Sequence, residues 1–427
     1  MSRRVAVTGM AGISPIGNDW AAVRERLGQY RNAVVRMQDW EDYDGLNTRL
    51  GAPAAPFELN ERYNRKAIRS MGRVALMATR ATELALADAG LLDHPLVKSG
   101  DMGVSFGSSA GTPSAIGDFG RMMEERTTKG INATTYIKMM AHTAPVNIGV
   151  FFGLTGRVIT TSSACTSGSQ GIGYAYEAIR AGKQTAMVAG GAEELCATEA
   201  AVFDTLFATS TRNDAGHTTP RPFDGGRDGL VIGEGAGCLI LEDMEHALAR
   251  GAVIHAELVG FGTNSDGCHV TQPNAATMQK AMQLALQDAG LRPSDIGYIN
   301  AHGTGTQQGD IAESQATLAV FGGATPISSL KSYMGHTLGA CGALEAWISI
   351  EMMREGWFAP TINLEQIDAE CAPLDYIAGE GRALECDYVM SNNFAFGGIN
   401  TSLIFKRYDK DGRSRAEGRF REDRSVR

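Results

Sequence analysis

The stretch Leu84-Ala-Leu-Ala-Asp-Ala-Gly-Leu91 recurs in the second half of the chain as Leu284-Ala-Leu-Gln-Asp-Ala-Gly-Leu291. Each copy ends an amphipathic run with glycine, the residue that most often terminates a helix. A strand-like run precedes each copy, and a short strand with a Gly/Ser/Thr-rich loop follows it. These flanking segments are residues 4–9 and 102–111 in the first half, and 256–262 and 296–305 in the second. The shared order of strand, helix and strand predicts a duplicated fold.

Alternating strands and helices along the chain predict an α/β protein with largely parallel, buried sheets. We place the boundary between the halves near residue 252, after a helical segment, so that the predicted units are residues 1–252 and 253–407. Residues 408–427 are almost wholly charged and polar and lack a repeating apolar face. We expect them to form a disordered tail.

The composition limits the classes of partner. The 427 residues carry 39 Lys+Arg against 48 Asp+Glu, a net charge of −9, which argues against nucleic acid as the main partner. No apolar run approaches the roughly 18 residues that span a bilayer, and the N-terminal stretch reads as a strand and turn, so we expect neither membrane insertion nor a signal peptide. The seven cysteines are scattered without a Cys-x-x-Cys pair. We expect no disulfide framework, and a cytoplasmic location.

Cys165 lies where a strand-like run, residues 156–161, gives way to a helix-like run, residues 171–180. A helix N-terminus offers free backbone N–H groups and a partial positive charge, which favour the reactive thiolate. The same N–H groups could hold the oxyanion that forms when a carbonyl is attacked. The neighbouring residues are small and leave room for a substrate. A buried, unreactive cysteine at a strand–helix corner is the competing interpretation.

Four further segments hold chemically active side chains among glycines. His302 lies in Asn300-Ala-His-Gly-Thr-Gly-Thr-Gln-Gln-Gly-Asp310, and His336 lies in Lys331-Ser-Tyr-Met-Gly-His-Thr-Leu-Gly-Ala-Cys-Gly342. An aromatic and glycine turn occupies residues 391–400. The fourth segment, residues 222–237, carries charged side chains that we expect to brace a buried turn by ion pairing: Asp224, Arg227, Asp228 and Glu234.

A metal site is an alternative for the histidine loops. His302, Asp310, Glu313 and His336 would have to converge with open coordination, and their loops lack the dense spacing of metal ligands. We therefore expect no metal. The nearby Gly-x-Gly patterns do not follow a nucleotide-binding fingerprint either.

Together these segments resemble the β-ketoacyl-acyl carrier protein (ACP) synthases of the thiolase superfamily. The resemblance rests on Ser-Ser-Ala-Cys-Thr-Ser-Gly around Cys165, the two histidine loops, and Asn-Phe-x-Phe-Gly-Gly over residues 393–398, and it extends over residues 3–406. Within the family the chain resembles the elongating synthases I and II, and synthase I more than synthase II. The implied fold is a thiolase-like duplicated fold, five-layered αβαβα with two mixed, largely parallel sheets.

The resemblance implies an elongating condensing enzyme, an acyltransferase of fatty-acid or related (polyene or polyketide-like) biosynthesis. Cys165 would take the acyl group from acyl-ACP, and its own N–H and that of Phe396 would form the oxyanion hole. His302 and His336 would stabilise the enolate that forms as malonyl-ACP loses carbon dioxide, and the acyl chain would grow by two carbons. Two glycine-flanked histidines separate this pattern from those of degradative thiolases and of synthase III.

Further roles are implied by the same resemblance. Lys331 would organise the site together with Glu313, and Asp310 would support the histidine loop. Thr304 and Thr306 would hydrogen-bond the phosphopantetheine arm that the ACP substrates carry. We expect no cofactor bound to the enzyme itself.

The resemblance also implies an acyl pocket and a gate. Ala110 matches the position whose side-chain size limits acyl length, and Phe394 and Phe396 match the gating loop. The chain departs from the family where Ala395 and Ile399 replace the usual glycine and threonine. Alanine adopts positive φ less readily than glycine, so gate motion and acyl substrate are left open.

ACP is acidic, and the resemblance implies that it docks on basic residues spaced along a helix: Arg65, Lys66 and Arg69, flanked by Arg62 and Arg73. A solvated helix face is the alternative interpretation. Family members form dimers, so the chain would pair with itself or with a chain-length-factor subunit. The alternative function is therefore a ketosynthase subunit of such a heterodimer. A non-catalytic thiolase-fold partner is disfavoured, because the cysteine and both histidines are retained.

Overall fold

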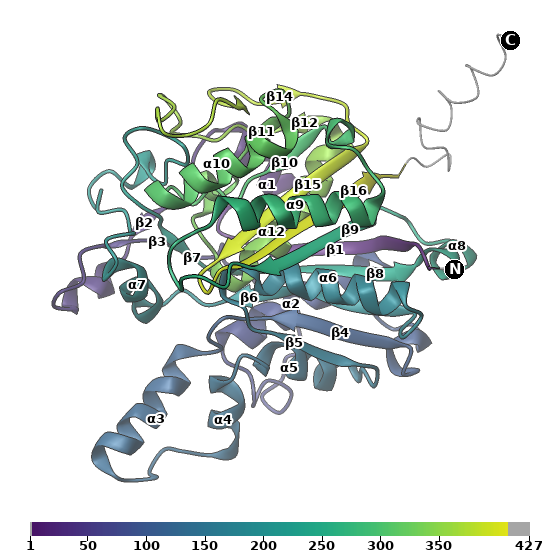
Figure 1. The fold of residues 1–427 in the computed structure, drawn as a ribbon. Coiled ribbons are helices and arrows are strands. Elements are labelled where there is room, and N and C mark those ends of the chain that lie inside the picture. The colour runs from purple at the N-terminus through teal and green to yellow at the C-terminus, as the bar shows by residue number, and fades with distance from the viewer. Residues whose placement is uncertain (1, 409–427) are drawn as a thin grey trace, which may run out of the picture.

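The computed structural model describes residues 2–408, so residues 409–427 of the predicted tail lie outside the described residues. Two halves of a sheet alternate with three layers of helices (Figure 1). The first half of the sheet comprises, in order, β5 (Val158–Thr161), β4 (Met102–Gly107), β6 (Ala186–Glu193), β8 (Gly235–Asp243) and β1 (Val5–Ile13). The second half comprises β9 (Ala256–Ser265), β16 (Ile399–Arg407), β15 (Tyr388–Ala395), β10 (Tyr298–Asn300), β11 (Pro326–Ser328) and β13 (Asp375–Tyr376).

Helices fill the other three layers. α6 (Ser167–Arg180) and α12 (Cys341–Glu355) contact strands of both halves and form the middle layer. α2 (Arg73–Asp88) and α5 (Thr143–Phe152) cover the outer face of the first half, and α9 (Ala275–Ala289), with α10 (Gln307–Phe321) beside it, covers the second. This arrangement confirms the predicted five-layered, thiolase-like fold.

The two halves of the sheet are also hydrogen-bonded to each other. Strands β1 and β9 pair antiparallel through Val5–Leu258, Ala6–Glu257 and Val7–Ala256, which joins the two predicted sheets into one of eleven strands. The sheet is mixed, as predicted. Parallel pairing is found among its outer strands, whereas the ladders around β1, β8, β9 and β16 are antiparallel.

The duplication appears in the strand order. The series β5-β4-β6-β8-β1 of the first half corresponds to β11-β10-β15-β16-β9 of the second. Equivalent glycines bring a helix against the innermost strand of each half, β1 or β9. A Cβ added at Gly9 would lie 2.2 Å from the carbonyl oxygen of Ala85, and one added at Gly260 would lie 2.5 Å from that of Ala285. The structure therefore confirms the internal repeat.

Shorter elements surround these layers: α1 (Trp20–Gly28), α7 (Ala197–Asp204), α8 (Met244–Ala249), α11 (Lys331–Met334), β2 (Val35–Arg36), β3 (Leu50–Ala52), β7 (Ile232–Gly233), β12 (Trp357–Phe358) and β14 (Arg382–Ala383). Helices α3 (Pro113–Glu125) and α4 (Ala133–Met139) project from the layers as an arm (Figure 1).

Residue 252, where we placed the boundary between halves, lies between α8 and β9. Among the described residues, no helix has both the length and the apolar character needed to cross a membrane.

Candidate active site

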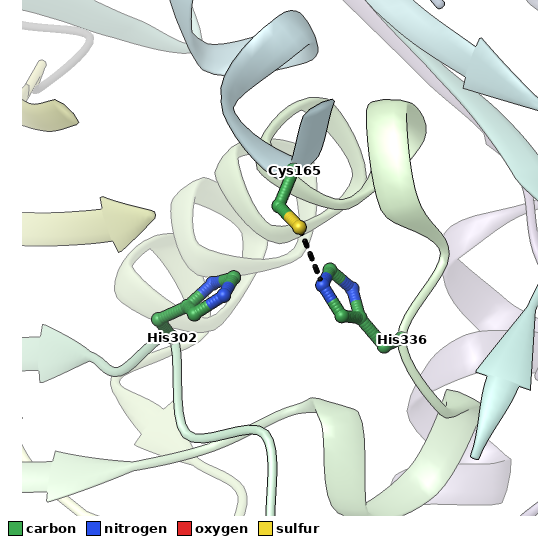
Figure 2. Close-up of side chains that lie close together, drawn as sticks. All are labelled: Cys165, His302 and His336. Atoms are coloured by element: carbon green, nitrogen blue, oxygen red, sulfur yellow. Dashed lines mark hydrogen bonds between the residues drawn. The ribbon is translucent and has the colours of Figure 1, made fainter. Parts of the chain in front are cut away.

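The side chains singled out from sequence gather because their loops follow strands that end on the same side of the sheet. Cys165 follows β5, His302 follows β10, and the loop with His336 follows β11. Parallel strands place their carboxyl ends at one edge, where α/β proteins commonly bind ligands. Figure 2 shows the sulfur of Cys165 directed at the ring of His336, with the ring of His302 on the other side of the gap.

Cys165 lies in a short 3₁₀ turn, Ala164–Thr166, immediately before α6. Ala164 has φ 52°, a left-handed conformation that is uncommon for a residue with a Cβ. The turn is held by the hydroxyl of Ser167, which accepts the N–H of Ser163 at 3.0 Å. Cys165 itself is 3% exposed. The strained turn thus presents the thiol at a helix N-terminus, as the sequence predicted.

The hydrogen bonds of His336 define its tautomer. Its Nδ1 accepts the N–H of Leu338 at 3.3 Å, so the proton of the neutral ring is on Nε2. Nε2 lies 2.9 Å from Cys165 Sγ. His336 therefore directs an N–H donor at the sulfur.

His302 is fixed through its backbone. Its ring centroid is 5.1 Å from that of His336, with the two rings at 87°. The carboxylate of Glu313 accepts the N–H of His302 and that of Gly303, both at 2.7 Å. Nδ1 of His302 is buried and has no hydrogen-bond partner among the described residues. The glycine-rich loop is thus anchored beneath the imidazole.

Asp310 anchors the next part of the same loop. One carboxylate oxygen accepts the N–H groups of Thr304 and Gly305, at 3.0 and 3.2 Å. Its other oxygen lies 3.4 Å from the Arg227 guanidinium, which also pairs with Asp368 at 2.6 Å. These contacts are the support of the histidine loop that the sequence predicted for Asp310.

The charged segment at residues 222–237 is built from ion pairs, which confirms its predicted bracing role. The pairs are Arg221–Asp224, Arg227–Asp310, Arg227–Asp368, Arg212–Asp228 and Arg73–Glu234.

The partner of Lys331 differs from the expectation. Its Nζ bonds the carboxylate of Glu345 on α12, and both side chains are fully buried. The amide of Asn393 donates to the other Glu345 oxygen at 2.7 Å. Glu313 uses its carboxylate on the backbone of the histidine loop instead. The ion pair of Lys331 is therefore with Glu345 on α12, and Glu313, with which Lys331 was expected to organise the site, acts on the ammonium group only through its charge.

Protonation follows from burial and from this ammonium group. Burial lowers the pKa of both His302 and His336 well below 6.5, and the charge of Lys331 lowers each further. Both imidazoles are therefore neutral near pH 7. Burial would also lower the pKa of Lys331, but the acidic groups around it, Glu345 first among them and Glu313 included, together outweigh burial, and the pKa of Lys331 is raised. The buried ammonium group of Lys331 thus lies close to two neutral rings.

The resting state of Cys165 is the thiol, not the thiolate that its helix end suggested. Burial raises the pKa of Cys165 to about 11. The charge of Lys331 and the backbone N–H groups of Phe396 and of Cys165 itself act in the opposite direction without overcoming burial. The same two N–H groups are those that sequence reasoning selected for an oxyanion hole, and both lie close enough to act on the sulfur.

A cavity of about 550 Å³ opens onto this site. Its walls include the three reactive side chains together with Glu313, Thr304, Thr306, Phe394, Phe396 and Phe203. The hydroxyls of Thr304 and Thr306 lie 2.9 Å apart. Ala110 is outside these walls, on the loop after β4, where its N–H is 3.4 Å from Glu193. The cavity thus brings together the predicted nucleophile, both histidines, Glu313, the two threonines and the two phenylalanines of the gate. Ala110, Asp310, the fully buried Lys331 and the basic residues Arg65, Lys66 and Arg69 lie outside its walls.

The Phe394–Phe396 segment is the tip of the β15–β16 hairpin. Phe394 lies 6.1 Å from the ring of His302, and Phe396 lies 4.9 Å from Phe203 on α7. Ala395 ends β15 in strand geometry, and the left-handed positions of the tip fall on Gly397 (φ 88°) and Gly398 (φ 68°). The substitution of glycine by alanine at this position therefore introduces no backbone strain.

The basic run at residues 65–69 is a turn, not the predicted helix, since α2 begins at Arg73. The side chain of Asn64 accepts the N–H of Lys66 at 3.1 Å and that of Ala67 at 3.2 Å. Such local bonds compete with helix formation. Arg65, Lys66 and Arg69 are exposed, whereas Arg62 pairs with Asp93 and Arg73 with the buried Glu234.

Of the four residues considered as metal ligands, only His302 and His336 come together, and Cys165 joins them. One ligand atom each of Cys165, His302 and His336 lies within 4.8 Å of the others. Asp310 and Glu313, the two other candidates, direct their carboxylates at backbone N–H groups. The seven cysteines, all within residues 2–408, are free thiols.

Sequence reasoning missed two buried carboxylates. Glu345 is the sole acidic residue in the apolar run 341–350, a pattern that signals a buried partner. Glu193 ends β6 and accepts the N–H of Ser109 at 2.6 Å and that of Gly339 at 3.1 Å, which ties the loop after His336 to the first half. Its signal was a charged residue at the end of a buried strand.

Comparisons with known proteins agree with this geometry. Residues 2–247 match the family model for the beta-ketoacyl synthase N-terminal domain, and residues 255–365 match that for the C-terminal domain. The chain is 36% identical over 412 residues to the 3-oxoacyl-[acyl-carrier-protein] synthase 2 of Synechocystis sp., covering 95% of this chain and 98% of that protein. It is 35% identical over 408 residues to the synthase 1 of Escherichia coli K12, covering 95% and 99%.

Solved structures that resemble this chain are also ketosynthases. A beta-ketoacyl synthase from Burkholderia phymatum STM815 aligns with a TM-score of 0.94 and 59% identity, covering 95% of this chain and all of that chain. The ishigamide ketosynthase/chain length factor aligns with a TM-score of 0.86 and 30% identity, covering 96% of this chain and all of that one.

Proposed function

Since the chain belongs to the β-ketoacyl synthase family, we propose that it extends acyl chains carried on ACP by decarboxylative condensation with malonyl-ACP. The enzyme is an acyltransferase of the condensing type. The observation that carries the proposal is a buried thiol and two neutral imidazoles that lie together in the wall of one cavity. Covalent catalysis needs the thiol, and charge stabilisation on a carbonyl oxygen needs uncharged N–H donors.

The first half-reaction loads the enzyme. Cys165 Sγ forms a bond with the acyl carbonyl carbon, and the bond between that carbon and the ACP thiol breaks. The N–H groups of Phe396 and Cys165 hold the oxyanion of the tetrahedral intermediate. The cysteine proton leaves with the departing ACP thiol, so no net charge stays in the buried site.

The second half-reaction forms the new carbon–carbon bond. Malonyl-ACP loses carbon dioxide, and the electron pair of that bond becomes an enolate, whose oxygen takes hydrogen bonds from His302 and His336. The enolate carbon then attacks the acyl carbonyl. Cys165 leaves as a thiolate and takes up one proton, which restores the resting thiol.

Neutral imidazoles suit this chemistry, because they can donate without adding positive charge to a site that already contains Lys331. Glu345 fixes the position of the Lys331 ammonium group, and the charge of that group lowers the pKa of the Cys165 thiol. We propose no enzyme-bound cofactor, since these side chains supply each step and the pantetheine arm arrives with the substrate. We propose that Thr304 and Thr306, whose hydroxyls lie 2.9 Å apart in the cavity wall, hydrogen-bond that arm.

The exposed cations of the turn at residues 65–69 are the proposed docking site for the acidic carrier. Arg65, Lys66 and Arg69 have no ion-pair partner within 4.0 Å among the described residues, so their charge is available to a partner. Changing all three to glutamate should raise KM for acyl-ACP and leave KM for a small pantetheine thioester unchanged. An unchanged KM for acyl-ACP would remove the docking proposal.

A second candidate is a ketosynthase subunit that works only with a chain-length-factor partner, and the likeness to the ishigamide ketosynthase/chain length factor favours it. Here too the chain would supply the nucleophile. The two candidates differ in whether the isolated chain condenses substrates, and we favour the independent enzyme because relatives of both synthase types match nearly all of the chain.

The test is a reconstitution of the purified chain with acyl-ACP and malonyl-ACP, with carbon dioxide and β-ketoacyl-ACP measured together. We expect both products from the parent. Cys165→Ala should abolish the β-ketoacyl product, and His302→Ala or His336→Ala should still acylate Cys165 but stop carbon dioxide release. Condensation that persists in Cys165→Ala would overturn the mechanism, and condensation that requires a second subunit would select the heterodimer.

A further inference from the structure

Glu199 is a buried acid without a partner. It lies in the first turn of α7, its side chain is 8% exposed, and neither carboxylate oxygen has a hydrogen-bond partner within residues 2–408. Burying a polar group without a hydrogen bond is costly, so such a group is retained only for a reason. The mechanism above does not use it.

Helix α7 forms part of the wall around the reacting groups. Phe203, one helical turn after Glu199, lines the cavity that contains Cys165. Phe203 and Ala200 belong to one apolar cluster with Leu338, which follows His336, and with Phe396. The side of α7 that carries Glu199 and Phe203 therefore packs against the loops of the active site.

A shared electrostatic neighbour, Glu193, also relates Glu199 to the nucleophile. The carboxylate of Glu193 raises the pKa of both Cys165 and Glu199, so it lies within electrostatic reach of each. Glu193 is bonded to the loop after β4 and to the turn after His336. Glu199 thus lies near the acid that also acts on the thiol, and one helical turn before the cavity-lining Phe203.

The surroundings make Glu199 a neutral acid. Burial first, and then the charges of Glu193, Cys196, Glu194 and Glu234, raise the pKa of Glu199 well above 4.5. The Arg73 guanidinium donates its hydrogen bonds to Glu234 and does not pair with the Glu199 carboxyl. A protonated carboxyl presents one donor and one acceptor and can bond a hydroxyl, a keto oxygen or an amine.

We propose that Glu199 is a specificity residue that hydrogen-bonds an oxygen or nitrogen group on the acyl chain held at Cys165. This inference rests on the proposed function. A purely alkyl chain in the same place would leave the carboxyl unpaired in apolar surroundings. Sites built to bond a substrate hydroxyl reject analogues that lack it far more strongly than apolar pockets discriminate between hydrocarbons. The preferred substrates are therefore acyl chains that carry a polar group.

The test compares matched pantetheine thioesters: alkyl chains of increasing length and the same chains with a terminal hydroxyl or a terminal amine. At the length that reaches Glu199, we expect the polar chain to be favoured in kcat/KM by roughly tenfold or more. Glu199→Leu should invert this preference, and Glu199→Gln should retain most of it. Preference for the hydroxyl indicates that Glu199 acts as the neutral acid, and preference for the amine that it acts as the carboxylate.

Thr198→Ala is the matched control, because Thr198 is exposed on the same turn of α7. It should leave the preference unchanged. Equal kcat/KM for polar and alkyl chains at every length in the parent would overturn the inference, as would a Glu199→Leu variant that shifts only the dimer dissociation constant. A parent that condenses no thioester at all would instead refute the proposed function.

Discussion

At the scale of single residues, the acidity of Cys165 can be measured directly. Its pKa of about 11 means that the thiolate fraction rises with pH throughout the usual range. Alkylation of Cys165 by iodoacetamide should therefore accelerate about tenfold per pH unit from pH 7 to pH 10, without a plateau. Mass spectrometry of the labelled peptides measures the rate, and the exposed Cys268 serves as the internal comparison.

Lys331 contributes to that acidity, because its charge is the largest influence opposing burial. Lys331→Met should slow the alkylation of Cys165 at every pH in this range. A plateau near pH 8 in the parent would show instead that the helix end governs the thiol.

The buried pair Lys331–Glu345 should dominate local stability. Glu345→Gln leaves a buried ammonium group without its counter-ion, which costs about 3–5 kcal/mol of the free energy of unfolding. Glu351→Gln, on the same helix but paired with the partly exposed Arg354, should cost less than about 1 kcal/mol. Urea denaturation measures both. The double variant Lys331→Met/Glu345→Leu should recover part of the loss, and its failure to do so would contradict the account of an uncompensated charge.

Glu199 gives a pH dependence of opposite sign to that of an ordinary paired carboxylate. Its folded-state pKa is raised, so the folded protein holds a proton that the unfolded chain releases above pH 4.5, and stability falls as pH rises through that window. Glu199→Gln removes this effect. Its gain in the free energy of unfolding over the parent should grow between pH 5 and pH 8, by at most about 1.4 kcal/mol per unit. A constant difference across this range would contradict a raised pKa.

At the scale of elements, close helix–strand contact is set by the glycines of β1 and β9. Gly260→Ala would place a methyl group 2.5 Å from the carbonyl oxygen of Ala285 on α9, and overpacking of this kind costs about 1–3 kcal/mol. Gly120 on the exposed α3 has nothing within 4 Å of an added Cβ, so Gly120→Ala should stabilise by roughly 0.5–1 kcal/mol. Thermal unfolding of the two variants measures the contrast, and a neutral Gly260→Ala would contradict the tight contact.

The elements that the sequence predicted well are those with a local cause. The repeat, the strand–loop positions of Cys165 and His302, and the glycine hairpin tip follow from periodicity and turn chemistry. The partner of Lys331 could not be predicted, because Glu345 lies on a separate helix and spacing along the chain does not say which carboxylate faces the ammonium group. The turn at residues 65–69 was missed because the side chain of Asn64, and not charge spacing, decides its backbone.

At the scale of the whole molecule, the duplication explains why the active site needs both halves. Equivalent 3₁₀ turns, Ala164–Thr166 and Leu338–Ala340, precede the two middle-layer helices α6 and α12, and each begins with a left-handed residue, Ala164 or Leu338. The first turn carries the nucleophile. At the matching position the second has Gly339, whose N–H is bonded by Glu193. One half thus supplies the thiol, and the other supplies both imidazoles.

The sheet also has an open edge, from which we predict the assembly of the chain. Strand β5 ends the sheet and pairs only with β4 among the described residues, and Val158 on it is 53% exposed. An exposed, unpaired edge strand is a template for a second chain. We expect copies to pair through β5, with the α3–α4 arm, which exposes Met123, lying close to the partner.

Sedimentation velocity tests this pairing, and Thr160→Pro on β5 should shift the chain from dimer toward monomer. Val253→Asp, on an exposed loop away from that edge, should leave the dimer intact, and a Thr160→Pro variant that sediments as the parent does would place the interface elsewhere.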